Sequence, residues 1–130
     1  MGDVTTMNAQ RRLTVLGERM SGKSTMLMRL AVEWGEAGET VLYEAASPGA
    51  ARESYNRFIA EHARYGWPDS RVDQVREGPM EVTFDGGGLV YFEWPGRYAP
   101  RKGPVDVHLL DQSTGDSRED ARVVVRAVLS

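Results

Sequence analysis

The stretch from Gly17 to Thr25 contains residue types that could bind phosphate. It reads GERMSGKST, which fits the pattern G-x-x-x-x-G-K-[ST]. In this pattern the glycines let consecutive backbone N–H groups point at phosphate oxygens, and the lysine and hydroxyl contact the terminal phosphates and Mg²⁺. We therefore expect Lys23 to reach the β- and γ-phosphates of a nucleotide and Ser24 to ligate Mg²⁺. The residues predicted to bind the nucleotide are Gly17, Arg19, Met20, Ser21, Gly22, Lys23, Ser24 and Thr25.

Lysine is scarce in the rest of the chain. Lys23 and Lys102 are the two lysines, and every other basic residue is an arginine. A phosphate loop needs a compact ammonium group, and the broad guanidinium fork does not fit that role. The lysine at the motif position therefore argues against a chance match, although an ordinary glycine-containing turn between a strand and a helix stays the alternative.

A carboxylate for the metal is expected at the end of a later apolar stretch. Asp111 follows VDVHLL, residues 105–110, and would lie at the sheet edge where phosphates bind. An ordinary turn aspartate is the alternative. The next residue, Gln112, can orient a water molecule but cannot accept its proton at neutral pH. The candidate catalytic residues are Gln112 and Arg19, and the pattern supports nucleotide binding better than hydrolysis.

Apolar runs and periodicities place the glycine-containing stretch between a strand and a helix. Residues 13–16 predict a buried strand, and residues 22–36 predict a helix because apolar side chains recur every three or four positions. A β-rich run at 40–46 predicts the second strand, and a second helix is expected over about 49–65.

The second half of the chain predicts strands and one hairpin. Residues 80–84 and 89–94 flank a glycine-rich turn, a strong hairpin signal, and residues 105–110 predict a further strand. At the end of the chain, the sequence from Ser117 resembles a capping box and favours a final helix. Its three consecutive valines leave a strand over Val123–Leu129 as the alternative.

This order of elements predicts an α/β fold: a three-layer P-loop NTPase fold with a mainly parallel sheet and a β-hairpin inserted at about 80–94. Residues 1–10 are predicted to be a flexible leader, and residues 11–130 a single domain. The 130-residue chain is 41% hydrophobic and 27% charged, as is typical of soluble proteins, and lacks an apolar run long enough to span a bilayer. We therefore expect no membrane contact and a cytoplasmic location, in the host cytosol if the protein is viral.

Two further features of composition restrict the chemistry. The formal net charge is −3, which argues against sequence-independent nucleic-acid binding by the whole surface. The chain contains no cysteine, which excludes disulfides and zinc–thiolate sites.

Four blocks of the sequence occur in an informative order. RMSGKS (19–24) has the form R-x-x-G-K-[ST]. TVLYEAASPGAARESYNRF (40–58) combines a strand ending in small residues with a helix that has an A-x-E-like face. EVTFDGGGLVYFE (81–93) is a hairpin, and RKGPVDVHLLDQ (101–112) is similar to the block R-G-x-x-x-D-x-x-x-x-D-E. In this order the blocks resemble the ATPase domain of tailed-phage terminase large subunits, the DNA-packaging motors, and more distantly helicase-type ATPase cores.

The resemblance implies a Mg-ATP site and a hydrolase related to DNA packaging, but the chain departs from it at several points. Gln112 stands where the family has its catalytic glutamate, and the coupling motif and the nuclease domain are missing. The family's sheet inserts a strand from beyond the magnesium motif beside the phosphate-loop strand, and Val123–Leu129 is the candidate for it. We expect a stand-alone, truncated or regulatory relative rather than a complete motor.

Two alternatives stay open. In a small GTPase of the Ras or gliding-motility type, Glu93-Trp94-Pro95-Gly96 would be a degenerate D-x-x-G motif, but the guanine-reading N-K-x-D motif is missing. In a non-hydrolysing regulatory module, the same site would hold nucleotide without turnover. The sequence does not specify ATP over GTP.

A basic cluster and two histidines complete the candidates. Arg97, Arg101 and Lys102 are either a solvated loop, an arginine finger for the γ-phosphate or a neighbouring subunit's nucleotide, or a contact for DNA or a partner subunit. A homo-oligomer is compatible with the second of these. We expect His62 to be a packing residue and His108 a hydrogen-bonded histidine of the core.

Overall fold

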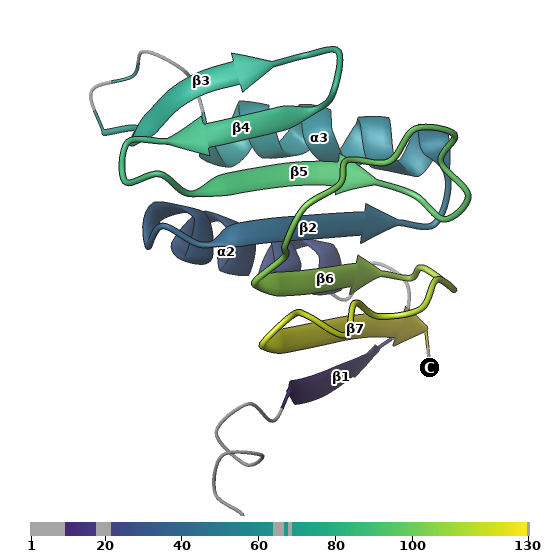
Figure 1. Cartoon of the computed structure of the whole chain (residues 1–130). Helices are drawn as coiled ribbons and strands as arrows, with labels where there is room; N and C mark the ends of the chain where they lie inside the picture. Colours follow the sequence, from purple (N-terminus) through teal and green to yellow (C-terminus); the bar gives the residue numbers. More distant parts are fainter. Residues whose placement is uncertain (1–9, 18–21, 64–66, 68, 130) are drawn as a thin grey trace, which may run out of the picture.

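The computed structural model of the chain describes residues 10–17, 22–63, 67 and 69–129. Within them, seven strands form one sheet in the order β1-β7-β6-β2-β5-β4-β3 (Figure 1). The first five of these strands run parallel, and β4 and β3 continue the sheet antiparallel. The elements are β1 (Arg11–Gly17), α2 (Lys23–Glu36), β2 (Thr40–Ala45), α3 (Pro48–His62), β3 (Val72–Arg76), β4 (Glu81–Phe84), β5 (Leu89–Glu93), β6 (Val107–Asp111) and β7 (Val123–Leu129). The predicted α/β fold with a mainly parallel sheet and a hairpin is confirmed.

The two helices lie on the same face of the sheet, behind it in Figure 1. The main core lies between them and the sheet, and its largest buried side chains include Leu27, Tyr43, Tyr55, Phe58 and Phe92. On the opposite face, a smaller cluster around Leu42, Tyr91, Leu110 and Val124 lies under the loops that follow β5 and β6. The predicted three layers are therefore wrong for the described residues, because loops take the place of helices on the second face.

Both predicted helices are confirmed with small changes of boundary. Helix α2 buries Leu27, Met28 and Ala31, which recur at helical spacing. Helix α3 begins after Ser47, whose side chain accepts a hydrogen bond of 3.2 Å from the Ala50 N–H, and Pro48 occupies the first turn.

The end of the chain is a strand, so the helix favoured there is wrong and the alternative strand is confirmed. Val123–Leu129 forms β7, which inserts between β1 and β6 with all three strands parallel. The residues that resembled a helix cap bind elsewhere: Asp120 Oδ2 accepts a hydrogen bond of 3.0 Å from the Val105 N–H, and the Arg118 N–H donates to His108 Nδ1 at 3.0 Å. Because these groups bind β6 and the loop before it, the valine-rich segment follows its β preference into the gap in the sheet.

Strand β1 is an edge strand rather than the buried strand that its apolar residues predicted. Leu13 is 60% exposed and Leu16 is 67% exposed. The reason is its position: β1 lies at one end of the strand order, where β7 is its neighbour.

Strand β3 has no counterpart among the sequence predictions. It pairs with β4 through a register irregularity between Val72 and Gln74. This irregularity interrupts the alternation of apolar and polar residues on which strand prediction depends.

Candidate functional site

Asp111 and Ser24 meet where β6 ends and α2 begins. The Ser24 Oγ donates a hydrogen bond of 2.8 Å to Asp111 Oδ2. In the sheet register Asp111 lies between Ala45 of β2 and Ala127 of β7, two residues with small side chains. The carboxylate therefore has room to face the first turn of α2.

Tyr43 of β2 binds the same carboxylate. Its hydroxyl donates a hydrogen bond of 2.7 Å to Asp111 Oδ2. Burial raises the pKa of Tyr43 well above its ordinary value, and the neighbouring Asp111 charge raises it further, whereas a hydrogen bond with Ser54 of α3 acts in the opposite direction. Tyr43 is thus a neutral donor at physiological pH, and one oxygen of Asp111 receives two hydrogen bonds.

Gly17 and residues 22–25 are the described residues of the stretch that matches G-x-x-x-x-G-K-[ST]. Gly22 caps α2 with a φ of 89°, a left-handed conformation that favours glycine. The Lys23 Nζ donates a hydrogen bond of 2.6 Å to the Gly17 carbonyl, which joins the two ends of the loop. The Thr25 hydroxyl accepts a hydrogen bond from Arg57. The predicted residues Arg19, Met20 and Ser21 lie outside the described residues.

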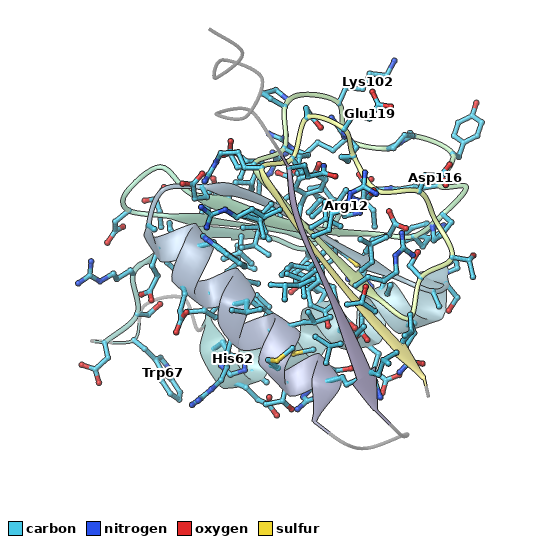
Figure 2. The ribbon with its side chains drawn as sticks, turned by 90° about the horizontal axis from the view of Figure 1, so that it is seen from below. Arg12, His62, Trp67, Lys102, Asp116 and Glu119 are labelled. Atoms are coloured by element: carbon cyan, nitrogen blue, oxygen red, sulfur yellow. The ribbon has the colours of Figure 1, made fainter. Side chains whose placement is uncertain are left out.

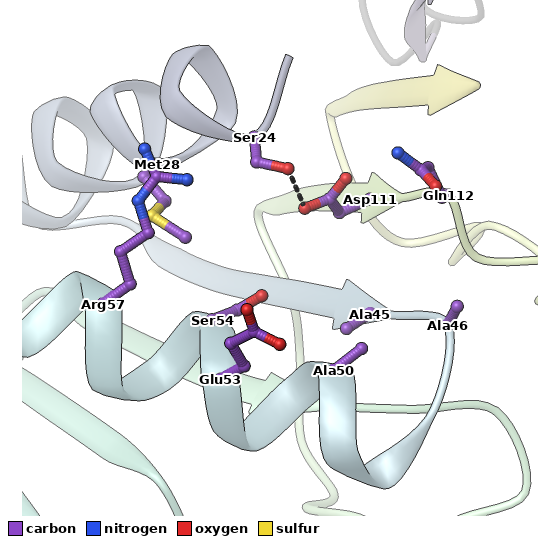
Figure 3. Close-up of a pocket in the computed structure, with 10 residues that line it drawn as sticks. All are labelled: Ser24, Met28, Ala45, Ala46, Ala50, Glu53, Ser54, Arg57, Asp111 and Gln112. Atoms are coloured by element: carbon purple, nitrogen blue, oxygen red, sulfur yellow. Dashed lines mark hydrogen bonds between the residues drawn. The ribbon is translucent and has the colours of Figure 1, made fainter. Parts of the chain in front are cut away.

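A cavity of about 420 Å³ opens beside the Ser24–Asp111 pair (Figure 3). This volume is near the lower end of the range for small-molecule sites, roughly 300–1,000 Å³. Its walls come from the first turns of α2, the end of β2, one face of α3 and the end of β6. The lining residues are Ser24, Met28, Ala45, Ala46, Ala50, Glu53, Ser54, Arg57, Asp111 and Gln112.

Helix α3 contributes polar residues to this cavity that the sequence interpretation did not assign to a site. Glu53, Ser54 and Arg57 lie on one face of the helix and point toward the cavity in Figure 3. Arg57 bonds to Thr25 and pairs with Glu61 Oε2 at 3.1 Å. The one signal that could have indicated them is the A-x-E-like face in the block of residues 40–58, which contains Glu53.

Gln112 lines the cavity with an unusual backbone conformation. Its φ is 57°, which is uncommon for a residue that is not glycine, and its N–H donates to the Ala127 carbonyl at 2.9 Å. The residue predicted to position water is therefore at the cavity, in a conformation imposed by the adjacent strand β7.

A buried polar network fixes the loop that follows Gln112. Glu44 of β2 accepts hydrogen bonds from His108 Nε2, at 3.1 Å, and from the Ser113 hydroxyl. His108 is fully buried, and its Nδ1 accepts a hydrogen bond from the Arg118 N–H, so the single ring N–H is at Nε2. The prediction of a hydrogen-bonded core histidine is confirmed. Burial opposes ionisation of Glu44, but the hydrogen bonds from His108 and Ser113 outweigh it and lower its pKa.

The basic cluster, for which an arginine finger is one of three interpretations, does not reach the cavity. Arg97 pairs with Glu93 Oε2 at 3.2 Å, and Arg101 pairs with Glu81 Oε2 at 3.2 Å. The exposed Lys102 side chain points away from the molecule in Figure 2. None of the three is among the described residues that line the cavity, so an arginine finger toward this chain's own site is not formed.

The oxygens at the site fit Mg²⁺ better than a metal that needs a cage of protein ligands. No group of three or more histidine, cysteine, aspartate and glutamate residues that could hold a metal is found in the described part of the chain. Mg²⁺ is commonly bound by one or two protein oxygens, with water and substrate phosphates completing its octahedron. Ser24 Oγ and Asp111 Oδ2 are the oxygens that could hold it here.

No protein-family model, no curated protein and no solved structure matches the chain. Of the helices that the structure describes, neither is long and apolar enough to cross a membrane.

Proposed function

We propose that this chain is a P-loop protein that binds a magnesium nucleoside triphosphate, with ATP as the first candidate. The observation that carries the proposal is the hydrogen bond of 2.8 Å between Ser24 and Asp111. The hydroxyl of a phosphate-loop motif and a carboxylate at the end of a strand, 87 positions apart in sequence, meet as a shared Mg²⁺ site requires.

The backbone around this pair supports the same function. Gly22 begins α2 without a side-chain hydrogen bond at the cap, so the first turn of the helix has N–H groups to offer to an anion. The Lys23 ammonium lies at this turn, and in the proposed complex it exchanges the Gly17 carbonyl for phosphate oxygens. Mg²⁺, when bound, neutralises phosphate charge and polarises the γ-phosphoryl group.

The strand order also favours the resemblance to terminase ATPases over the small-GTPase alternative. Strand β7 lies between the strand that leads into the phosphate loop and the strand that ends in Asp111. This is the insertion that the terminase resemblance implies. Glu93, the candidate metal ligand in the GTPase interpretation, instead binds the Arg101 N–H at 2.6 Å and Arg97 at 3.2 Å.

The test is binding of fluorescent ATP and GTP analogues to the purified chain, with and without Mg²⁺. We expect Mg²⁺-dependent saturable binding, weakened roughly 10- to 100-fold by Lys23→Ala, because hydrogen bonds to charged groups contribute about 1.5–3 kcal/mol. Lys102→Ala removes the other lysine, which is exposed, and should leave the affinity unchanged.

Each other result has a defined meaning. Equal affinity of wild type and Lys23→Ala, or no binding of either nucleotide at high micromolar concentration, would refute the proposal. Tighter binding of GTP than ATP would favour the GTPase alternative. If phosphate is released faster when DNA is added, the chain is functionally close to the packaging motors that it resembles.

A further inference from the structure

We propose that Glu53 is the general base of this site and that the chain hydrolyses its nucleotide. This inference rests on the proposed function and goes beyond it, because the glutamine at position 112 removes the base expected there. The geometry points to α3 as the element that supplies the general base instead.

The cavity contains two carboxylates among its described lining residues, Glu53 and Asp111. Asp111 already has another role. One of its oxygens accepts hydrogen bonds from both Ser24 and Tyr43, and the same carboxylate is the proposed metal ligand. Gln112 has no proton-accepting group at neutral pH, and Arg57 is a cation. Glu53 is therefore the described lining residue that can take a proton from water.

The Glu53 side chain has the freedom that this role requires. It projects from α3 into the cavity, across from the Ser24–Asp111 pair in Figure 3. Among the described residues, no hydrogen bond or ion pair engages its carboxylate. The neighbouring acidic residue on this helix, Glu61, is by contrast paired with Arg57. The Glu53 side chain is exposed, so water can reach its carboxylate.

The proposed step consumes water and a nucleoside triphosphate. Glu53 accepts one proton from a water molecule as the water oxygen forms a bond to the γ-phosphorus. The bond between that phosphorus and the β–γ bridging oxygen breaks, and its electron pair stays on the nucleoside diphosphate. The proton then passes from Glu53 to the released phosphate or to solvent, which restores the carboxylate.

The experiment compares wild type with Glu53→Gln, which keeps the shape of the side chain and removes its basicity. Phosphate release from γ-labelled ATP should fall by about 10²–10⁴-fold, the usual contribution of a general base. The affinity for Mg-ATP should rise about two- to fivefold, because a negative charge near the phosphates is removed. After gel filtration, wild type should retain ADP and the variant should retain unhydrolysed ATP.

The matched control is Glu33→Gln, at an exposed position of α2, which should change neither affinity nor release. Glu53→Asp should recover part of the activity, because it restores a base on a shorter side chain. A wild-type chain that binds ATP but releases no phosphate would overturn this inference and leave the proposed binding function intact. Unchanged release in Glu53→Gln would also overturn it, whereas failure of wild type to bind nucleotide would refute both.

Discussion

At the scale of single residues, the candidate site depends on one oxygen atom of the Asp111 carboxylate, Oδ2. Ser24 and Tyr43 both donate to it, from α2 and β2 respectively. Two donors on one oxygen fix the orientation of the carboxylate before any metal arrives. Removing the hydrogen-bonding partner of a metal ligand typically costs about 10–100-fold in metal affinity or activity.

Tyr43→Phe should therefore weaken the response to Mg²⁺ specifically. We expect the Mg²⁺ concentration for half-maximal ATP binding to rise roughly tenfold, while binding of the metal-free nucleotide stays unchanged. The measurement is a Mg²⁺ titration at fixed fluorescent ATP. Tyr98→Phe is the control, because Tyr98 is fully exposed. An unchanged Mg²⁺ midpoint in Tyr43→Phe would show that Tyr43 does not position Asp111.

A second prediction at this scale concerns acid stability. The pKa of Glu44 is lowered from its ordinary value of 4.5, as hydrogen bonds from His108 and Ser113 outweigh its burial, with help from the Arg126 charge. Because the folded pKa lies below the unfolded one, the unfolded state binds more protons in this window. The contribution of Glu44 is therefore present above pH 4.5 and is lost as the pH falls through the lowered value.

Glu44→Gln should accordingly lower the free energy of unfolding by about 1–3 kcal/mol near neutral pH, because it replaces charged hydrogen bonds. The variant should also lose part of the decline in stability below pH 4.5. Urea unfolding curves at a series of pH values measure both effects, and Glu119→Gln, at an exposed position, serves as the control. Parallel stability–pH curves for Glu44→Gln and wild type would contradict the prediction.

The site residues divide clearly into those that the sequence predicts and those that it does not. Ser24 follows from a local motif, and Asp111 follows from an apolar strand that ends in a carboxylate. Tyr43 and Arg57 carry no such signature. Tyr43 reaches Asp111 through the pairing of β2 with β6, and Arg57 reaches the cavity through the packing of α3 against the sheet.

At the scale of elements, the contact between α2 and the β4–β5 hairpin depends on two glycines. A Cβ atom added to Gly88 would lie 1.8 Å from the Gly35 carbonyl oxygen, and one added to Gly35 would lie 2.6 Å from Phe84 Cε1. The helix and the turn before β5 are thus in direct backbone contact. This contact fixes the end of α2 opposite to the phosphate loop.

Gly88→Ala should destabilise the protein by more than about 2 kcal/mol, since the clash is with backbone and a rotamer change cannot relieve it. Gly49→Ala is the matched control: a Cβ there meets nothing within 4 Å, and alanine in a helix should be neutral or stabilising by about 0.5 kcal/mol. Chemical denaturation of the two variants provides the comparison. Equal stability of both variants would mean that α2 and the hairpin are less closely packed than described.

Local sequence signals explain which helices and strands were predicted correctly. Helices α2 and α3 and the β4–β5 hairpin have local signals, namely apolar periodicity, a capping serine and a glycine-rich turn. Val123–Leu129 forms a strand because it pairs with both β1 and β6, and no local sequence pattern reveals these two partners. The capping groups before it found partners on β6 and in the preceding loop instead.

At the scale of the whole molecule, the sheet is asymmetric. One face carries both helices and the cavity, and the other carries loops fixed by buried polar groups such as Glu44 and Glu93. One edge is the antiparallel pair β3 and β4, and the other is β1 with its exposed leucines. The site lies on the helical face, at the ends of the parallel strands β2 and β6.

The position of β7 has a consequence for the order of events during synthesis. Strand β1 leaves the ribosome before β7, its partner in the sheet, and their pairing begins with Arg11 opposite Val123. At about 5–20 residues per second, many seconds of translation separate the two strands. The nascent chain therefore carries residues 17–25 for some time before β7 can pair with the strand that leads into them. The nucleotide binding proposed above should therefore require that β7 has entered the gap between β1 and β6.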